Sequence, residues 1–159
     1  MTPVNIFRPV RLQNIVAPAV VLPVDRYDQP FLILGEGEGA IACFIGNEHR
    51  FETMPAFNNE NWKGLAFEDL EVEVDLQSLI GVEGHAAPTG SLVRKDKRLE
   101  LIAIARERVF ADRRRFVICD DLPAGDGGIE VAFTRWYLVK REGERVIFKH
   151  EIVAGDPPE

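Results

Sequence analysis

The chain is predicted to be mostly β, a single-domain antiparallel β-barrel or β-sandwich with at most one or two short helices. Two observations predict this class. Most apolar segments are rich in Val, Ile, Phe and Leu, and Gly, Pro, Asn or Asp interrupts them about every 8 to 14 residues. Within the clearest segments apolar and polar residues alternate, which is the period of a strand with one buried face.

The first predicted hairpin joins the apolar runs Phe31 to Leu34 and Ala40 to Ile45. Between them lies Gly35-Glu-Gly-Glu-Gly39, whose three glycines allow a tight reversal or a bulge. A phosphate-binding loop is the less favoured reading, because no Lys-Ser/Thr follows and two glutamates would repel an anion.

The clearest single strand is Leu70 to Leu76, in which apolar and acidic residues alternate strictly. One face of this strand is expected to be buried. The other face carries Glu71, Glu73 and Asp75, and it is expected to meet water or a basic partner.

The segment from Arg98 to Arg115 can be read as a helix or as strands. It is rich in helix formers, yet Leu99, Leu101 and Ala103 alternate, and a helix would place Arg106 within its apolar stripe. We favour a strand to about Phe110, a turn over residues 111–114 and a returning strand over residues 115–120.

The C-terminal part is predicted to form a second hairpin, from Ile129 to Lys140 and from Arg145 to Val153. Residues 141–144 include Gly143, which tolerates positive φ at a turn. On the second strand His150 alternates with Phe148 and Ile152, so it is expected to face inward with them.

The domain organisation is expected to be simple, with one domain over residues 1–153 and a flexible tail over residues 154–159. The beginning of the sequence lacks the basic and apolar regions of a signal peptide, and prolines interrupt the longest apolar run. Cys43 and Cys119 both lie in apolar runs and are expected to be buried and unpaired. We therefore expect a cytoplasmic protein without a membrane partner.

The formal net charge is −7, which disfavours a nucleic-acid partner. The charge is also uneven along the chain. Residues 36–75 carry ten acidic residues against two Lys or Arg, whereas residues 94–115 carry nine basic residues against four acidic ones. These blocks are neighbours in one fold, complementary faces in an assembly, or solvated strand faces that differ in sign.

No catalytic or metal-binding motif is present in the sequence. The only serines, Ser78 and Ser91, lie outside a G-x-S-x-G motif, and the three histidines lack metal-ligand spacing. We therefore predict no catalytic residue, no metal and no cofactor. If the chain is an enzyme after all, His49 or His85 is the expected acid/base group or first metal ligand.

The candidate ligand-binding residues are His85, Trp62, His49, Arg113, Arg114 and Arg115. His85 lies in a glycine-rich loop, and Trp62 lies in a polar segment where an aromatic side chain either plugs one end of a barrel or stacks on a ligand. The arginine triplet, expected at a turn, is suited to gripping a phosphate or carboxylate or the acidic strand of a neighbour.

The Gly35-Glu-Gly-Glu-Gly39 segment resembles the glycine-rich first strand of calycin-type barrels, a family that binds haem or small apolar molecules inside the barrel. The resemblance covers these five residues, and the accompanying Gly-x-Trp is missing. It implies a small-molecule pocket, whose mouth we expect at the Trp62 and His85 loops.

Taken together, these features favour a non-enzymatic β-domain that acts by binding or by homo-oligomeric assembly, with a homodimer as the expected form. The alternative is a calycin-like barrel that binds a small molecule. A small metal-assisted or acid/base enzyme is the least favoured of the three.

Overall fold

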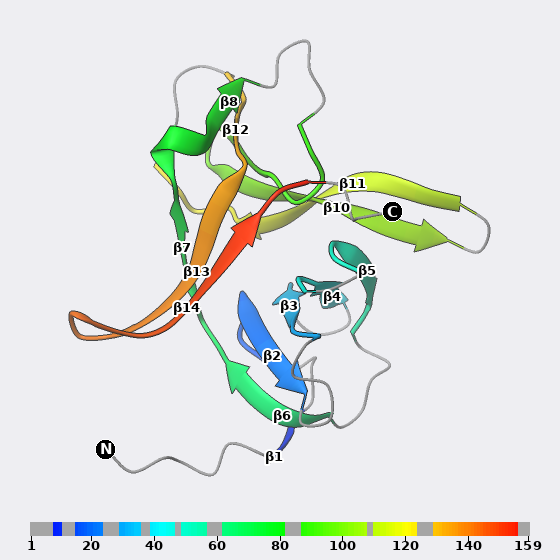
Figure 1. Cartoon of the computed structure of the whole chain (residues 1–159), viewed down its shortest axis with the longest axis vertical. Helices are drawn as coiled ribbons and strands as arrows, with labels where there is room; N and C mark the ends of the chain where they lie inside the picture. Colours follow the sequence, from blue (N-terminus) through cyan, green and yellow to red (C-terminus); the bar gives the residue numbers. More distant parts are fainter. Residues whose placement is uncertain are drawn as a thin grey trace. The chain divides into compact units, whose positions relative to one another are not determined.

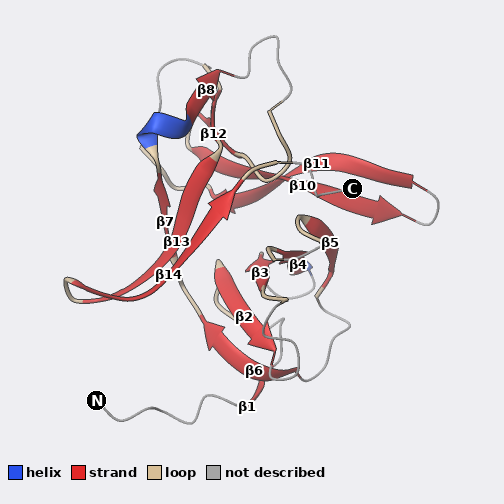
Figure 2. Cartoon of the chain, viewed as in Figure 1, coloured by secondary structure: helices blue, strands red, loops and turns tan. Residues whose placement is uncertain are grey.

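The computed structural model describes residues 8–10, 15–23, 29–35, 39–46, 49–56, 62–81, 87–107, 110–123 and 129–155. Strands dominate these residues, and one short 3-10 helix lies between β7 and β8 (Figure 2). The predicted mostly β class is confirmed. No helical segment in this part of the chain has the length and apolarity needed to cross a membrane.

The chain divides into two compact units, Met1–Leu70 and Glu71–Glu159. The single domain expected over residues 1–153 and the flexible tail stay predictions. At the start of that tail the backbone N–H groups of Ala154 and Gly155 donate to Thr134 O at 2.8 Å and to Thr89 O at 2.9 Å.

Within its described residues the first unit contains six short strands, which pair antiparallel in the order β1-β6-β2-β3-β4-β5 (Figure 1). Their bounds are β1 Arg8–Val10, β2 Ala19–Pro23, β3 Phe31–Leu34, β4 Ile41–Phe44, β5 Glu52–Pro55 and β6 Trp62–Phe67. All four residues of β3 are buried, as expected for a central strand covered on both faces. Its core cluster includes Ile15, Ala19, Val21, Phe31, Ile33, Ala40, Ala42 and Ala56.

The first predicted hairpin is confirmed, because β3 pairs with β4 from Phe31 opposite Phe44 to Leu34 opposite Ile41. Gly35 begins the connection with a φ of 75°. In β4 the side chain of Cys43 is fully buried, and this burial raises the pKa of its thiol to about 12.

The second unit contains two groups of antiparallel strands and the 3-10 helix Leu76–Ser78. The first group has the order β11-β10-β9-β12-β8, with β8 Leu79–Gly81, β9 Leu92–Lys95, β10 Arg98–Glu107, β11 Phe110–Cys119 and β12 Val131–Phe133. The second is a three-stranded sheet of order β14-β13-β7, with β7 Glu71–Val74, β13 Arg135–Glu142 and β14 Arg145–Val153.

The ambiguous segment forms strands, as favoured, but the predicted turn was wrong. Residues 111–114 lie inside β11, where Ala111 pairs with Arg106 and Arg114 pairs with Ala103. The reversal between β10 and β11 therefore comes earlier in the sequence. The side chains of residues 111–115 are exposed, so this polar stretch reads as a turn although its backbone is paired.

The C-terminal hairpin is confirmed, but its first strand is shorter than predicted. The predicted strand is interrupted at Thr134, whose N–H donates to Ser78 O at 3.3 Å. β12 and β13, on either side of Thr134, belong to different sheets. The reversal between β13 and β14 contains Gly143 with a φ of 64°, as expected. In Figure 1 this hairpin is the long orange and red ribbon pair.

Both cysteines are free. Cys119 differs from the expectation of a buried residue, because it lies half-buried near the end of β11. Its Sγ lies 2.8 Å from Asp121 Oδ1, and partial burial together with this contact raises the pKa of the thiol.

Candidate interaction surface

The residues predicted from sequence as ligand-binding do not form one cluster in the described part of the chain. His85 lies outside the described residues. For Trp62 only the backbone is described, and it begins β6. The side chain of His49 is 60% exposed, and its Nδ1 lies 3.2 Å from Glu52 Oε2. His49 is thus an exposed residue paired with a neighbour on its own loop, and its ligand-binding role stays a prediction.

The three arginines of the predicted triplet have separate partners along β11. Arg113 donates to the backbone carbonyl of Ala87, and Arg114 Nε lies 3.5 Å from Asp112 Oδ2. Arg115 is the most fully engaged, because its two terminal nitrogens donate to Glu130 at 2.9 and 3.1 Å. A paired bidentate guanidinium of this kind is less available to an outside anion than a solvated one.

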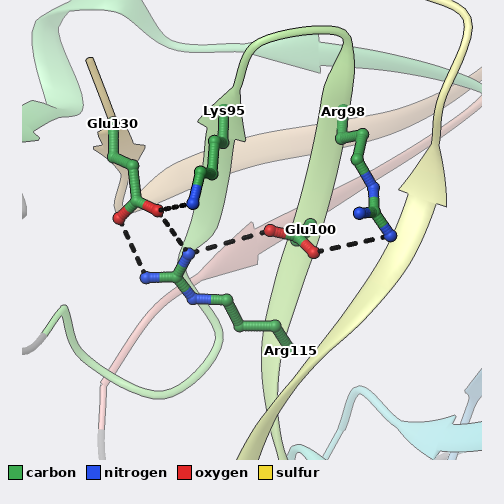
Figure 3. A network of polar contacts seen from close by, with 5 residues as sticks. All are labelled: Lys95, Arg98, Glu100, Arg115 and Glu130. Atoms are coloured by element: carbon green, nitrogen blue, oxygen red, sulfur yellow. Dashed lines mark hydrogen bonds and ion pairs between the residues drawn. The ribbon is translucent and has the colours of Figure 1, made fainter. Parts of the chain in front are cut away.

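Arg115 and Glu130 belong to a network of five charged side chains on β9, β10, β11 and the residue before β12 (Figure 3). Glu130 is also 3.3 Å from Lys95, and Arg115 is 3.7 Å from Glu100, which lies 4.0 Å from Arg98. The hydrogen bonds from Arg115 are the main cause that lowers the pKa of Glu130 to about 2. The basic block of the sequence is therefore partly neutralised within its own unit.

Substituting Glu130 with glutamine is expected to lower the free energy of unfolding at pH 7 by no more than about 1 kcal/mol, because the pair is near the surface. The pKa of Glu130 is lower in the folded state, so the contribution of its carboxylate is complete above about pH 4.5 and is lost as the pH falls toward 2. Urea unfolding at pH 7, 4 and 3 checks this, with the exposed turn variant Glu144→Gln as control. A difference between wild type and Glu130→Gln that stays constant over this range would contradict it.

A second charged cluster covers the outer face of the three-stranded sheet. Arg141 on β13 pairs with Glu71 at 2.5 Å and with Glu73, both on β7. Lys149 on β14 lies 3.9 Å from Glu73 and 4.4 Å from the centre of the Tyr137 ring. The hydrogen bond from Arg141 lowers the pKa of Glu73. The basic partner expected for the acidic strand is thus provided by the same chain.

The inner face of the same sheet is apolar and tightly packed. Trp136 and Leu138 on β13 are fully buried, and the indole N–H of Trp136 donates to Gly90 O at 2.9 Å. Tyr137, the next residue of β13, lies on the opposite face and is half-buried. His150 pairs opposite Leu138 and is half-buried, and this burial lowers its pKa.

The outer edge of β14 is the most distinctive exposed feature of this sheet. β14 has nine residues, and in the described part of the chain its strand partner is β13 alone. Three of its apolar side chains are exposed by about two fifths: Val146, Ile147 and Val153. Long unpaired strand edges with exposed apolar side chains are typical of sites where another chain adds to a sheet.

A shallow pocket of about 300 Å³ lies beside the C-terminal end of β14. It is lined by Asp75, Gln77, Ser78, Thr134, Arg135 and Val153. The Ser78 hydroxyl is already occupied, because it donates to Asp75 O at 2.7 Å and accepts from the Arg135 N–H at 3.0 Å. The volume of the pocket is at the lower limit for pockets that hold small molecules. Nowhere in the described ranges do three or more His, Cys, Asp or Glu residues gather closely enough to hold a metal ion.

A model of the protein family described as "Uncharacterised protein y4lG" matches residues 9–155. The chain belongs to this family. A y4lG relative, "Uncharacterized protein y4lG" of Sinorhizobium fredii (strain NBRC 101917 / NGR234), is 30% identical over 126 residues, which cover 79% of this chain and 77% of that protein. No solved structure matches the chain. The range matched by the y4lG family model includes all of β14.

Sequence reasoning found the alternation of β14 but missed its edge. Alternation reveals which side chains share a face, and it says nothing about whether a strand has one neighbour or two. A usable signal was present: Val146 and Ile147 are consecutive apolar residues beside a turn, so one of them had to lie on the outer face.

Proposed function

We propose that this member of the y4lG family is a binding domain that acts by homo-oligomeric assembly, as a homodimer. One observation carries the proposal: β14 presents an unpaired edge, within the described residues, that also exposes Val146, Ile147 and Val153. Soluble proteins protect such edges or use them for association. A symmetric dimer that covers the edge removes both the unpaired backbone groups and the apolar surface from water.

The charge blocks of the sequence contribute less to the proposal than the strand edge. Arg141 and Lys149 already meet the acidic residues of β7, and Arg115 already meets Glu130 and Glu100. Neutralisation of these surfaces therefore needs no second chain. We expect assembly to depend mainly on apolar and backbone contacts, with a modest effect of salt.

The remaining features of the proposal follow from the same sheet and from the thiols. The open edge of the three-stranded sheet supports a sandwich over a closed barrel, because a barrel has no edges. The free cysteines support the expected cytoplasmic location. A role without catalysis is supported by the engaged Ser78 hydroxyl and by the buried Cys43 thiol with its pKa of about 12.

Light scattering after size-exclusion chromatography tests the assembly. The wild-type chain is expected at about twice its monomer mass of 17.9 kDa. Substituting Ile147 with lysine places a charge on the covered edge and is expected to yield monomers. The matched control is Leu76→Lys, which changes a more exposed apolar side chain, 74% exposed, outside β14. A wild-type protein that remains monomeric at high micromolar concentration would overturn the proposal.

A further inference from the structure

We infer that two copies of the chain pair antiparallel through β14, with His150 of one copy opposite His150 of the other. This inference rests on the proposed homodimer and specifies its interface. The result is a continuous six-stranded sheet in which β14 of each copy is central.

The direction of the backbone N–H and C=O groups of β14 decides which of its residues can bond to a second strand. Thr134 lies opposite Ala154 in the β13–β14 register, and the Ala154 N–H donates to Thr134 O. In an antiparallel ladder hydrogen-bonded pairs alternate, so the even-numbered residues of β14 bond to β13. The N–H and C=O groups of Lys149, Glu151 and Val153 then point to the free edge. The alternation ends before Ile147, because the register shifts there: Lys140 lies opposite Phe148 and Arg141 opposite Val146.

This alternation limits the ways in which two β14 strands can pair. Hydrogen-bonded pairs across the new interface must join odd-numbered residues of the two strands. The two β14 strands can therefore be shifted along each other only in steps of two residues. Centring the pair on Lys149 or on Glu151 places two like charges directly opposite each other, which is unfavourable. Centring it on Phe148 leaves Val153 without a partner residue on the opposite strand.

When the pair is centred on His150, opposite charges lie opposite each other and apolar residues lie opposite apolar residues. Lys149 of each copy then lies opposite Glu151 of the second copy, which gives two cross-strand ion pairs. Glu151 is exposed and has no ion-pair partner within the described residues, and half of the Lys149 side chain is exposed. The histidines at the centre form a non-hydrogen-bonded pair.

The same register covers the exposed apolar side chains of β14. Ile147 lies opposite Val153 of the second copy, and Val146 lies opposite Ala154. Phe148 lies opposite Ile152. Counted along the strand, each of its three exposed apolar residues thus lies opposite an apolar residue of the second copy.

The free edge of β14 ends at Val153, the last residue of this strand that the proposed pairing uses. The N–H of Gly155, two residues beyond β14, donates to Thr89 O of the same chain at 2.9 Å. The available stretch thus runs to Val153, the last residue of β14, and this is the residue that pairs with Ile147.

Disulfide trapping tests the register. In a Cys119→Ser background, which leaves only the buried Cys43, single cysteines are placed at positions 149, 150 and 151. A non-hydrogen-bonded antiparallel pair brings Cα atoms to about 4.5 Å, within disulfide range. We expect His150→Cys to form a covalent dimer under mild oxidation at least about tenfold faster than Lys149→Cys or Glu151→Cys. The Cys119→Ser protein without a new cysteine is the control for the native thiol.

Charge reversal provides a second measurement that does not depend on thiol chemistry. Glu151→Lys is expected to weaken dimerisation about tenfold, because two attractive pairs become repulsive. Combining it with Lys149→Glu is expected to restore the affinity, with folding of each variant checked by circular dichroism.

The possible outcomes separate the two proposals. The register is wrong, and the proposed homodimer remains, if the dimer forms disulfides fastest through position 149 or 151. The same holds if the dimer forms disulfides through none of the three positions and is insensitive to the charge reversal. A wild-type protein that stays monomeric overturns both. Rapid linking at position 150 with rescue by the double charge reversal supports both.

Discussion

Replacing Trp136 by alanine is expected to lower the free energy of unfolding by about 3–5 kcal/mol, the largest effect among the substitutions considered. Trp136 is fully buried on β13 between Val74 and Ile152 on the neighbouring strands. Its indole N–H also donates to Gly90 O, just before β9, so one side chain ties the three-stranded sheet to the segment that leads into the other sheet of the unit. Alanine loses the packing and the hydrogen bond together.

Two further variants separate these contributions in urea unfolding experiments. Trp136→Phe retains much of the apolar packing but leaves the Gly90 carbonyl unpaired, so we expect a loss of about 1–3 kcal/mol. Tyr137→Ala removes the adjacent aromatic residue from the half-buried outer face and is expected to cost less than Trp136→Ala. The explanation fails if Tyr137→Ala proves as damaging as Trp136→Ala.

The second large effect is expected from a single methyl group at Gly35. Its φ of 75° is unfavourable for alanine by about 1–2 kcal/mol, and an added Cβ would lie 3.0 Å from the Gly39 carbonyl oxygen. Gly35→Ala is therefore expected to lower the free energy of unfolding by about 2 kcal/mol.

Gly39→Ala provides a matched control in the same connection. An added Cβ at Gly39 meets nothing within 4 Å, and no positive φ opposes it. We expect its melting temperature to stay close to that of the wild type, whereas Gly35→Ala melts several degrees lower. Equal effects of the two substitutions would show that the strained backbone at Gly35 is not the cause.

The sequence predicted those elements whose signal is local. Alternation in residues 70–76 and 145–153 identified β7 and β14, but β7 ends at Val74, and Leu76 is 74% exposed in the 3-10 helix that follows. The glycines at 35 and 143 marked reversals that the structure contains. Alternation also favoured strands over a helix in residues 98–115, because the helical reading required Arg106 within an apolar stripe.

The errors arose where pairing to a distant strand outweighed local polarity. Residues 112–115 are exposed and charged, as turn residues are, yet each of them pairs with a residue of β10. The break at Thr134 was missed because residues 129–140 carry no turn residue; it follows from hydrogen bonds to Ser78, which lies 56 residues earlier in the chain.

The candidate site was predicted less well than the fold. The sequence located the charge blocks but left open whether they meet within one fold, meet in an assembly or face solvent. Arg141 meets Glu71 across 70 residues of sequence, and Arg115 meets Glu130 across 15. The Arg114 side chain lies beside Asp112 on its own strand, which spacing alone would have suggested.

The sequence by itself determined that this protein buries alternate apolar side chains along its strands, because this pattern depends on each residue and its nearest neighbours. Only the tertiary structure decided which strands have one neighbour and which have two, and hence that β14 presents an edge. Strand pairing joins residues far apart in the chain, so the exposed backbone groups and the companions of each charge are properties of the assembled sheet.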